Sequence, residues 1–364
     1  MHLPRLDWGR VAACLAIMFL ILSTSPTAEA QKNKKGVTVV PSEAARRVDV
    51  SIDGQPFTSY IWPDSLKKPV LYPLRTATGT PVTRGYPLDP RPGERVDHPH
   101  HVGLWFNYGS VNGIDFWNNS TSLKPDAAAK MGTVMHRRIV STKNGKDSGE
   151  LEVESDWVMP DGKPVLRETT RFVFHHAANT RVVDRITKLT ALDQRVIFKD
   201  NKEGVLGLRV ARELEHPSKE KLVFTDASGK PTDVPAMNNE GVSGMYRSSE
   251  GKTGDDVWGT RGRWVTLSGK VNGEDVVVAM LDHPQNPGYP TYWHARGYGL
   301  FAANPLGQKV FSTDKKEATV SELNFMLEPK QSTTFRHRLL IMSGGAVAPE
   351  QLEAQYKQFV AGVK

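Results

Sequence analysis

Histidine is concentrated in one short stretch of the sequence, where His98, His100 and His101 fall within four positions around Pro99. Histidine titrates near neutral pH, so it serves as a proton donor, a proton acceptor or a metal ligand. In an extended segment His98 and His100 share one face, and His101 points to the other. The spacing indicates a functional site; the alternative is that the imidazoles are partly buried structural groups bonded to backbone carbonyls.

A second stretch, residues 282–296, repeats the order Asp-His-Pro of residues 97–99 and again combines histidine with tryptophan. It provides a carboxylate, two imidazoles and an indole, which are Asp282, His283, His294 and Trp293. We expect the two stretches to meet in space, with Arg209 and Arg296 nearby. The histidines of both stretches and Asp282 would then be the catalytic acid and base groups of one cleft.

Glu213 is a further candidate catalytic carboxylate. It follows a segment, residues 204–212, whose composition and alternation predict a strand. If the strand continues, Arg209 and Glu213 share a face, and the arginine keeps the carboxylate ionised as a base. The alternative is a surface ion pair between Glu213 and Arg212.

A metal site is a second use for these side chains, since imidazole and carboxylate together suit zinc, iron or copper. The ligands would be four imidazoles with Asp97 or Asp282, the imidazoles being those of His98, His100, His283 and His294. No His-x-Glu-x-x-His or cysteine-bearing ligand spacing is present in the sequence. We therefore predict no cofactor and keep a divalent metal at these histidines as an alternative.

The elements that must position these residues are predicted to be strands, because apolar residues recur with a period of two from residue 37 onward. Residues 47–53 and 165–174 show the alternation most clearly. Further strands are predicted at residues 181–192, 204–212, 263–267, 275–281, 319–327 and 333–342. Asn-Gly pairs between segments indicate tight hairpins. The sequence therefore predicts an all-β fold, an antiparallel β-sandwich.

Two irregular segments and one helix complete the pattern. Residues 72–99, rich in proline, are expected to form a long ordered loop that brings the histidines to one face. Residues 218–262 are expected to be a flap beside the site or a solvent loop. A helix is expected at the C-terminus, where Pro349 stands in the first turn and Gly362 closes an apolar stripe. This stripe should pack on a sheet.

The N-terminus has the pattern of a secretory signal peptide. Arg5 and Arg10 precede an apolar run, residues 11–22, and Ala28-Glu29-Ala30 resembles a cleavage site. The only cysteine, Cys14, lies within this peptide, so the mature chain has no thiol and no disulfide. We therefore predict an exported protein, periplasmic or extracellular. No later apolar run is long enough to span a membrane.

This organisation divides the chain into three parts, a signal peptide (residues 1–30), an N-terminal linker (31–45) and a single domain (46–364). The formal net charge of the chain is +7 at pH 7. The basic residues are scattered instead of forming a stripe, which argues against a nucleic-acid partner. A basic balance is compatible with an anionic substrate or surface.

Four motifs resemble a known family. These are residues 98–106 (HPHHVGLWF), 111–117 (VNGIDFW), 282–287 (DHPQNP) and 292–305 (YWHARGYGLFAANP). In their order and identity they resemble the secreted bacterial family labelled "methane oxygenase PmoA", a domain of unknown function. The membrane subunit of that name is a multi-span helical protein, so methane oxidation is not expected of this chain.

The family looks similar to the galactose-mutarotase-like supersandwich, which implies a concave sheet that presents histidine, arginine and carboxylate groups to a sugar. Aromatic faces stack on sugars, and polar groups bind their hydroxyls. The substrate-binding residues implied here are Trp105, Arg209, Trp293, Arg296 and Asn304. Three functions follow as hypotheses: a carbohydrate-active hydrolase, lyase or epimerase using histidine as acid or base; a metal-dependent hydrolase or oxygenase; and a non-catalytic glycan-binding protein.

Overall fold

The computed structural model describes residues 35–219, 221–226, 228, 230–234, 238–315, 320–345 and 347–363. The expected signal peptide, residues 1–30, lies outside the described residues.

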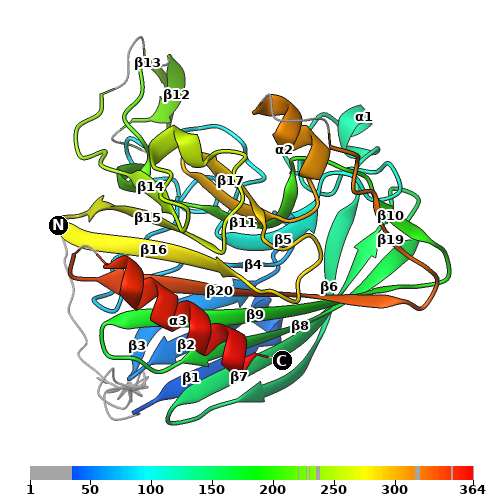
Figure 1. Ribbon diagram of the computed structural model, residues 1–364, viewed down its shortest axis with the longest axis horizontal. Coiled ribbons are helices and arrows are strands. Elements are labelled where there is room, and N and C mark those ends of the chain that lie inside the picture. The colour runs from blue at the N-terminus through cyan, green and yellow to red at the C-terminus, as the bar shows by residue number, and fades with distance from the viewer. Residues whose placement is uncertain are drawn as a thin grey trace, which may run out of the picture.

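Two eight-stranded antiparallel sheets form the body of the protein (Figure 1). The first contains, in spatial order, β1 (Val37–Ser42), β2 (Arg47–Ile52), β3 (Gln55–Ile61), β4 (Val70–Leu71), β5 (Leu104–Tyr108), β11 (Gly204–Arg209), β18 (Leu300–Asn304) and β17 (Tyr292–Arg296). The second contains β14 (Met245–Ser248), β15 (Trp264–Val271), β16 (Glu274–Asp282), β20 (Ser332–Ser343), β9 (Thr180–Ala191), β8 (Pro164–His175), β7 (Ser148–Val158) and β6 (Thr133–Lys143). The predicted all-β antiparallel sandwich is confirmed.

Short elements connect and cover these sheets. They are two small ribbons, three helices and three 3-10 turns: β10 (Val196–Phe198) with β19 (Phe325–Leu327), β12 (Leu222–Thr225) with β13 (Pro231–Val234), α1 (Pro125–Ala128), α2 (Gln308–Asp314), α3 (Pro349–Gly362), η2 (Glu43–Ala45), η3 (Arg212–Leu214) and η4 (Gly254–Val257). Among the described residues, no helix is long and apolar enough to cross a membrane.

The period-two pattern explains how the sheets pack. On β7, Leu151 and Val153 are buried, whereas Glu152 and Glu154, which alternate with them, are only partly buried. The buried faces of the two sheets meet in one core, where Phe106 of the first sheet lies 5.5 Å from Phe335 of the second, measured between ring centroids. Fully burying an aromatic or branched side chain stabilises a fold by about 1.5–3 kcal/mol, so this core holds the sandwich together.

The C-terminal helix α3 packs on the outer face of the second sheet, as predicted (Figure 1). Leu352 and Phe359 of the helix join a cluster of buried residues with Trp264, Leu281 and Leu340. The helix therefore covers the part of the outer face that β15, β16 and β20 form, and a ligand site there would have to compete with that packing.

Two sequence predictions are corrected by the strands. Residues 37–42, expected to belong to the linker, form β1 and pair with β2, so the sheet begins before residue 46. The strand predicted at residues 204–212 ends at Arg209 and is followed by the turn η3. Glu213 therefore does not share a strand face with Arg209.

The outer face of the first sheet carries polar and aromatic residues, and the short helix α2 covers it at β17, where Phe311 packs on Tyr292 and His294. Directly paired positions on antiparallel strands point to the same face, and Trp105, Gly207, Ala302 and His294 are paired one after another across β5, β11, β18 and β17. A Cβ atom at Gly207 would come within 2.4 Å of the Trp105 ring, so the indole lies directly over the glycine backbone. This face, with the loops above it, holds the candidate site.

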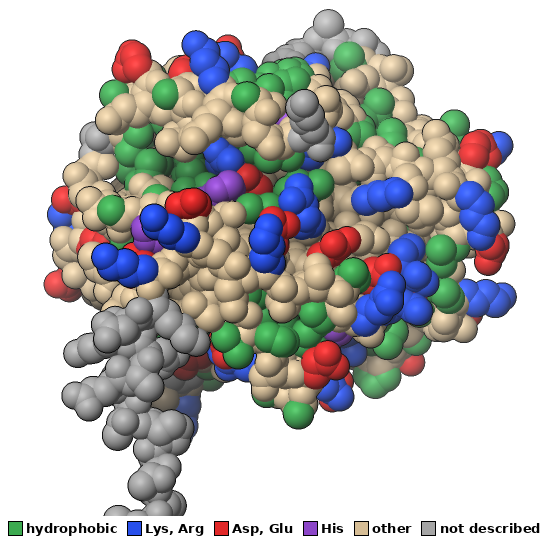
Figure 2. All heavy atoms as spheres, turned by 90° about the horizontal axis from the view of Figure 1, so that it is seen from below, with side chains coloured by type: hydrophobic (Ala, Val, Ile, Leu, Met, Phe, Trp, Pro, Cys, Tyr) green, Lys and Arg blue, Asp and Glu red, His purple; other side chains and the backbone are tan. Residues whose placement is uncertain are grey.

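Charged side chains on the surface are mixed in sign. In the view of Figure 2, basic and acidic groups alternate over the described part of the molecule, and the basic ones do not merge into a stripe. That pattern is typical of an ordinary solvated surface.

Candidate active site

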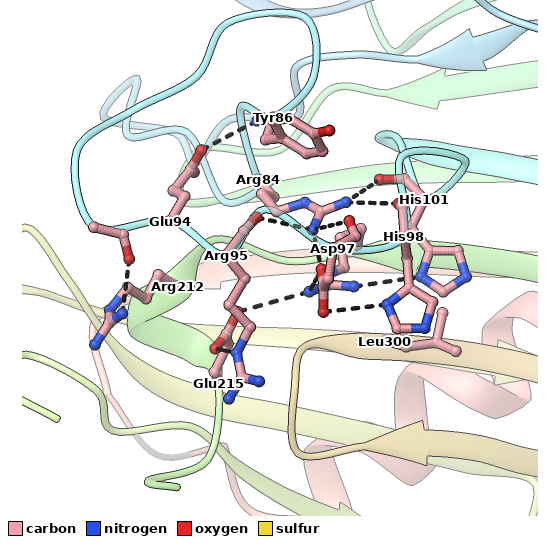
Figure 3. A network of polar contacts seen from close by, with 12 residues as sticks. Arg84, Tyr86, Glu94, Arg95, Asp97, His98, His101, Arg212, Glu215 and Leu300 are labelled. Atoms are coloured by element: carbon pink, nitrogen blue, oxygen red, sulfur yellow. Dashed lines mark hydrogen bonds and ion pairs between the residues drawn. The ribbon is translucent and has the colours of Figure 1, made fainter. Parts of the chain in front are cut away.

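Arg84 holds the histidine-rich loop in place (Figure 3). Its guanidinium is 1% exposed and donates hydrogen bonds to the carbonyl oxygens of Asp97 (2.9 Å), His98 (3.0 Å) and His101 (3.0 Å), and it also pairs with the Asp97 carboxylate. Because one planar group fixes three carbonyls, the backbone of residues 97–101 is tightly defined. His98 adopts a φ of +40°, a conformation that non-glycine residues rarely take without such support.

Asp97 is a paired carboxylate. Arg209 donates to its Oδ1 at 2.7 Å, and His98 Nδ1 lies 3.1 Å from its Oδ2. Burial alone would raise its pKa, but Arg209, the His98 hydrogen bond and Arg84 outweigh burial and hold the pKa of Asp97 below its usual range. Asp97 is therefore an anion that orients arginine and histidine.

Glu215 is the carboxylate that lies beside Arg209, with Oε1 3.9 Å from the guanidinium, and it also pairs with Arg95 at 2.5 Å (Figure 3). It is completely buried, and burial raises its pKa to about 7. The sequence predicts a carboxylate beside Arg209 at Glu213; in the structure this carboxylate is Glu215, two residues later. Glu213 is half-buried in η3, where its carbonyl oxygen accepts the Ser243 N–H.

Four near-parallel rings, Trp105, His101, His98 and Tyr298, form what we call the ring stack. Neighbouring centroids are 5.1, 4.8 and 4.9 Å apart along this order, with interplanar angles of 19°, 3° and 5°. His101 Nδ1 faces the Arg209 guanidinium at 3.3 Å and so accepts its hydrogen, which leaves the His101 proton on Nε2. The stack joins the histidine loop to β5 and to the turn after β17.

His100 and Lys68 lie beside the ring stack. The His100 ring meets His101 edge-on at 4.3 Å, and burial lowers the His100 pKa to about 2, with a further contribution from Lys68. Lys68 is 4% exposed, and its Nζ lies 5.5 Å above the Trp105 ring. Burial lowers the Lys68 pKa to about 7, although Asp115 opposes this shift. His100 is therefore neutral at neutral pH, whereas Lys68 loses its charge near neutral pH.

His294 and Glu203 form a second pair on the same sheet face. His294 Nδ1 donates to the Lys202 carbonyl oxygen at 3.0 Å, so the neutral ring keeps a lone pair on Nε2. Burial lowers its pKa to about 3. The Glu203 carboxylate lies 3.8 Å from His294 Nδ1, and burial raises the Glu203 pKa. His98 and Asp115 also act electrostatically on Glu203, which places this pair close to the ring stack.

A pocket of about 370 Å³ adjoins both groups of residues. Tyr298, the last ring of the stack, forms part of its wall, and so does Trp258, whose ring lies 4.6 Å from that of His294. Arg296 and His216 complete the polar side of the lining. The pocket is thus bounded by aromatic faces and by residues next to the titratable groups.

Several buried polar atoms around the ring stack have no hydrogen-bond partner among the described residues. These atoms are His100 Nε2, His101 Nε2, Trp105 Nε1, Trp117 Nε1, Ser120 Oγ and Asn119 Oδ1. Leaving a buried polar group unpaired costs about 1–3 kcal/mol. A cluster of such groups is expected where a protein accepts a polar ligand or ordered water.

The second Asp-His-Pro segment lies elsewhere. Asp282 ends β16 and accepts hydrogen bonds from Asn286 Nδ2 (2.7 Å) and the Thr291 N–H (2.8 Å), while the His283 ring packs 5.2 Å from Phe359 of α3. The expected convergence is therefore wrong for Asp282 and His283, because β16 belongs to the second sheet. Only His294, on β17, reaches the face that carries the histidine loop.

The residues predicted to bind substrate are likewise divided between the two faces of the sheet. Trp105, Arg209 and Arg296 lie on the outer face, as required, with Arg209 wholly buried. Trp293 points into the core, where it packs 5.9 Å from Phe301 and donates to the Gly262 carbonyl oxygen.

Asn304 is also wholly buried. Its side chain fixes the turn after β18, because it donates to the Asn201 carbonyl oxygen and accepts the Leu306 N–H. Neither Trp293 nor Asn304 is free to bind a substrate.

The alternative metal site is not assembled. His283 is held under α3 and cannot join His98, His100 and His294. In the part of the chain that the structure describes, no group of three or more His, Cys, Asp or Glu side chains is arranged to hold a metal ion.

Sequence reasoning missed Lys68, Glu203, Trp258 and Tyr298. Lys68 lies in a loop between strands, and Glu203 lies in the turn before β11, so neither has a periodic pattern to mark it. Tyr298 follows Arg296 within one of the quoted motifs, so its proximity to the histidines was the only available signal.

Comparison with known proteins gives a family and a set of structural neighbours. A search of curated proteins found no matching sequence. Solved structures with a similar fold include a galactose 1-epimerase from Lactobacillus acidophilus NCFM (10% identity, 86% of this chain and 100% of that one, TM-score 0.37). They also include a galactose mutarotase-like protein from Clostridium acetobutylicum (12%, 86% and 100%, TM-score 0.32) and a putative aldose 1-epimerase from Escherichia coli K12 (13%, 85% and 99%, TM-score 0.27). No residue role is transferred from them.

The family model that matches is described as a family of unknown function, DUF6807, and it covers residues 47–357. The resemblance to proteins labelled PmoA is not part of that description and stays a prediction. The chain is a member of the DUF6807 family.

Proposed function

We propose that this protein acts on a carbohydrate, and that Glu203 exchanges a proton with the substrate while imidazoles of the same face assist. The observation that carries the proposal is the pocket bounded by Tyr298 and Trp258, because each of these rings also touches a histidine of the site. Aromatic walls next to proton-transfer groups suit a ring-shaped, hydroxyl-rich substrate.

Hydrogen-bonding capacity supports a sugar in particular. Trp105 and Trp117 each offer a buried N–H group without a partner among the described residues, and His101 offers another at Nε2. These groups lie behind the lining of the pocket, so ordered water would connect them to the hydroxyls of a bound sugar, which both donate and accept. An apolar ligand of the same size would leave all of them unpaired.

The state of the titratable groups supports proton transfer. Burial raises the pKa of Glu203, which brings it closer to the pH at which a carboxyl can both give and take a proton. His100 and His294 stay neutral because burial lowers their pKa values, so their rings bind and orient hydroxyl groups through hydrogen bonds and leave the proton transfer to the carboxyl group. Burial thus shifts the pKa of the carboxyl group upward and the pKa values of the imidazoles downward, which gives the two kinds of group different roles without a metal ion.

The number of free carboxylates favours epimerisation or elimination over hydrolysis. Most glycosidases use two carboxylates that flank the bond. Here Asp97 is occupied by Arg84 and Arg209, and Asp115 accepts hydrogen bonds from the Trp117 N–H, the Asn118 N–H and Asn118 Nδ2. Glu215 is paired with Arg95 and Arg209, and the exposed Asp255 with His216. Glu203 is therefore the partly buried carboxylate without an arginine or backbone N–H partner among these residues, and a neutral imidazole assists it by hydrogen bonding to the substrate.

A screen for turnover tests the proposal. The purified protein would be incubated with plant, algal and host glycans and with reducing monosaccharides, with and without chelator, and products would be followed by nuclear magnetic resonance. We expect anomer exchange, epimer formation or unsaturated products that survive chelation. Binding without any product would instead make this a glycan-binding protein, and neither binding nor product would reject the proposal.

We also propose that the protein is exported and that the segment from residue 37, where β1 begins, forms one domain. Sequencing the N-terminus of material secreted by the native host tests the first point, with Gln31 as the expected first residue. Intact Met1 in exported material would contradict it. Limited proteolysis that leaves one stable fragment would support the single domain.

A further inference from the structure

We infer that the pocket selects sugars that carry a carboxylate, that is, uronic acids or glycans built from them. The inference rests on the proposed function and names the substrate class for the same site. Its structural basis is Arg296, which faces the pocket of about 370 Å³ from the end of β17.

Arg296 forms no ion pair with a residue that the structure describes; its charge acts on the Glu203 carboxylate through space, where it opposes the rise in the pKa of that group. Its guanidinium lies 4.5 Å from the centre of the Trp258 ring, and it makes no hydrogen bond or ion pair with any residue that the structure describes. Two other arginines of this face, Arg84 and Arg209, are fully buried and paired with Asp97. The protein thus satisfies those arginines internally and leaves Arg296 open toward the pocket.

The stacking on Trp258 prepares Arg296 for a carboxylate. A guanidinium that lies over an indole ring and has no hydrogen bond of its own keeps its N–H groups available for a carboxylate, which can accept two of them in parallel. Because the side chain is already ordered by the stack, binding loses less conformational freedom than it would at a mobile arginine. The pocket is therefore better suited to an anion than to a hydroxyl group alone.

His216 supplies a second contact of the right kind for a hydroxy acid. Its Nδ1 lies 3.1 Å from Asp255 Oδ1 and donates to it, which leaves a lone pair on Nε2. This Nε2 atom is buried and has no partner among the described residues. A sugar hydroxyl can donate to His216 Nε2 while the sugar carboxylate binds Arg296, so a uronic acid satisfies both groups at once.

The surrounding charges also favour an anion. Arg296 and Lys202 both act electrostatically on the buried His294, and Lys68 acts on His100. Against these cations, Asp255 is the acidic residue in the pocket lining, and its side chain is 84% exposed to solvent. Solvent screens that charge, so the field inside the pocket is set by the arginine.

Matched pairs of ligands give the test. Methyl glycosides of glucuronic acid and galacturonic acid would be compared with their methyl esters, which have the same ring and hydroxyls but no negative charge. Isothermal titration calorimetry on the full-length mature protein gives the ratio of the two dissociation constants. We expect the acids to bind at least ten times more tightly than the esters.

Variants locate the origin of that ratio. Arg296→Gln should bring the ratio close to one, and Arg296→Lys should restore part of it, since the charge returns without the planar fork. Arg247→Gln is the matched control, because it removes an exposed guanidinium that lines a different pocket, and it should leave the ratio unchanged. Glu203→Gln should keep the preference for the acid even where turnover is lost.

The outcomes separate the two proposals. If acids and esters bind equally well, or if Arg296→Gln keeps the preference, the selection of uronic acids is wrong and the carbohydrate function stands. If no glycoside of either type binds, the selection of uronic acids is also wrong, and the carbohydrate function then depends on the result of the glycan screen alone. Circular dichroism of each variant shows whether it is folded before its ratio is read.

Discussion

The same three residues, Asp-His-Pro, serve different purposes at positions 97–99 and 282–284. Asp97 is surrounded by two arginines and a histidine, lies next to solvent and stays ionised. Asp282 is fully buried and accepts hydrogen bonds from the neutral groups of Asn286 and Thr291, and burial raises its pKa to about 7. Sequence identity over three residues therefore does not decide chemistry; the neighbours supplied by distant strands do.

The largest expected effect concerns the sheet face that carries the first Asp-His-Pro segment. Glu203→Gln keeps the shape of the side chain but cannot transfer a proton, so turnover should fall at least 100-fold with the unfolding free energy nearly unchanged. Steady-state kinetics and urea unfolding measure the two quantities. Glu328→Gln, at an exposed position, is the control. Full activity of Glu203→Gln would move the reaction away from this face.

The imidazoles should show the next largest effect. His100→Ala and His294→Ala are each expected to lower turnover per folded molecule at least tenfold, because both rings border the titratable groups of the site. His283→Ala, beneath α3, should change stability and leave turnover per folded molecule intact. Equal effects of His283→Ala and His294→Ala on turnover and stability would contradict the different roles of the two histidines.

Asp282→Ala should be a purely structural loss. It removes the acceptor for Asn286 Nδ2 and for the Thr291 N–H, both buried, so the unfolding free energy should fall by about 1–3 kcal/mol. Chemical unfolding gives this value, and the activity of the remaining folded protein should match that of the wild type. A variant as stable as the wild type would show that these hydrogen bonds are replaced by water.

The smallest effect, and the sharpest contrast, is in pH dependence. The folded state raises the pKa of Asp282 from an ordinary 3.8 to about 7, so its contribution to stability is present below pH 3.8 and is lost as the pH rises to about 7. Asp97 has a lowered pKa, so its contribution is present above pH 3.8 and is lost as the pH falls further.

Urea unfolding between pH 3 and 8 separates these two behaviours. The stability difference between the wild type and Asp282→Asn should decrease from about pH 4 to 7, whereas the difference for Asp97→Asn should stay level over that range and decrease below it. Parallel curves for the two variants would mean that their carboxylates share one environment.

Local patterns in the sequence were sufficient to predict the strands and α3. Alternation of apolar residues in a strand, and an apolar stripe along a helix, show which side of the element is buried. They did not give the sheet to which each strand belongs, and this is why His283 and His294, eleven residues apart, were expected in one cleft. The end of β11 at Arg209 was also invisible, so Glu213 was chosen and Glu215 missed. Lys68 and Glu203 join the site through contacts across the chain that no local pattern encodes.

Gly207 determines how closely the ring stack approaches the sheet. Because this position has no side chain, Trp105 rests on the backbone of β11, and His101, His98 and Tyr298 follow in order up to the wall of the pocket. A methyl group at this position would overlap the Trp105 ring, so the indole could not keep its place on the sheet. The position of every ring in the stack, up to the wall of the pocket, therefore depends on one residue of β11 that has no side chain.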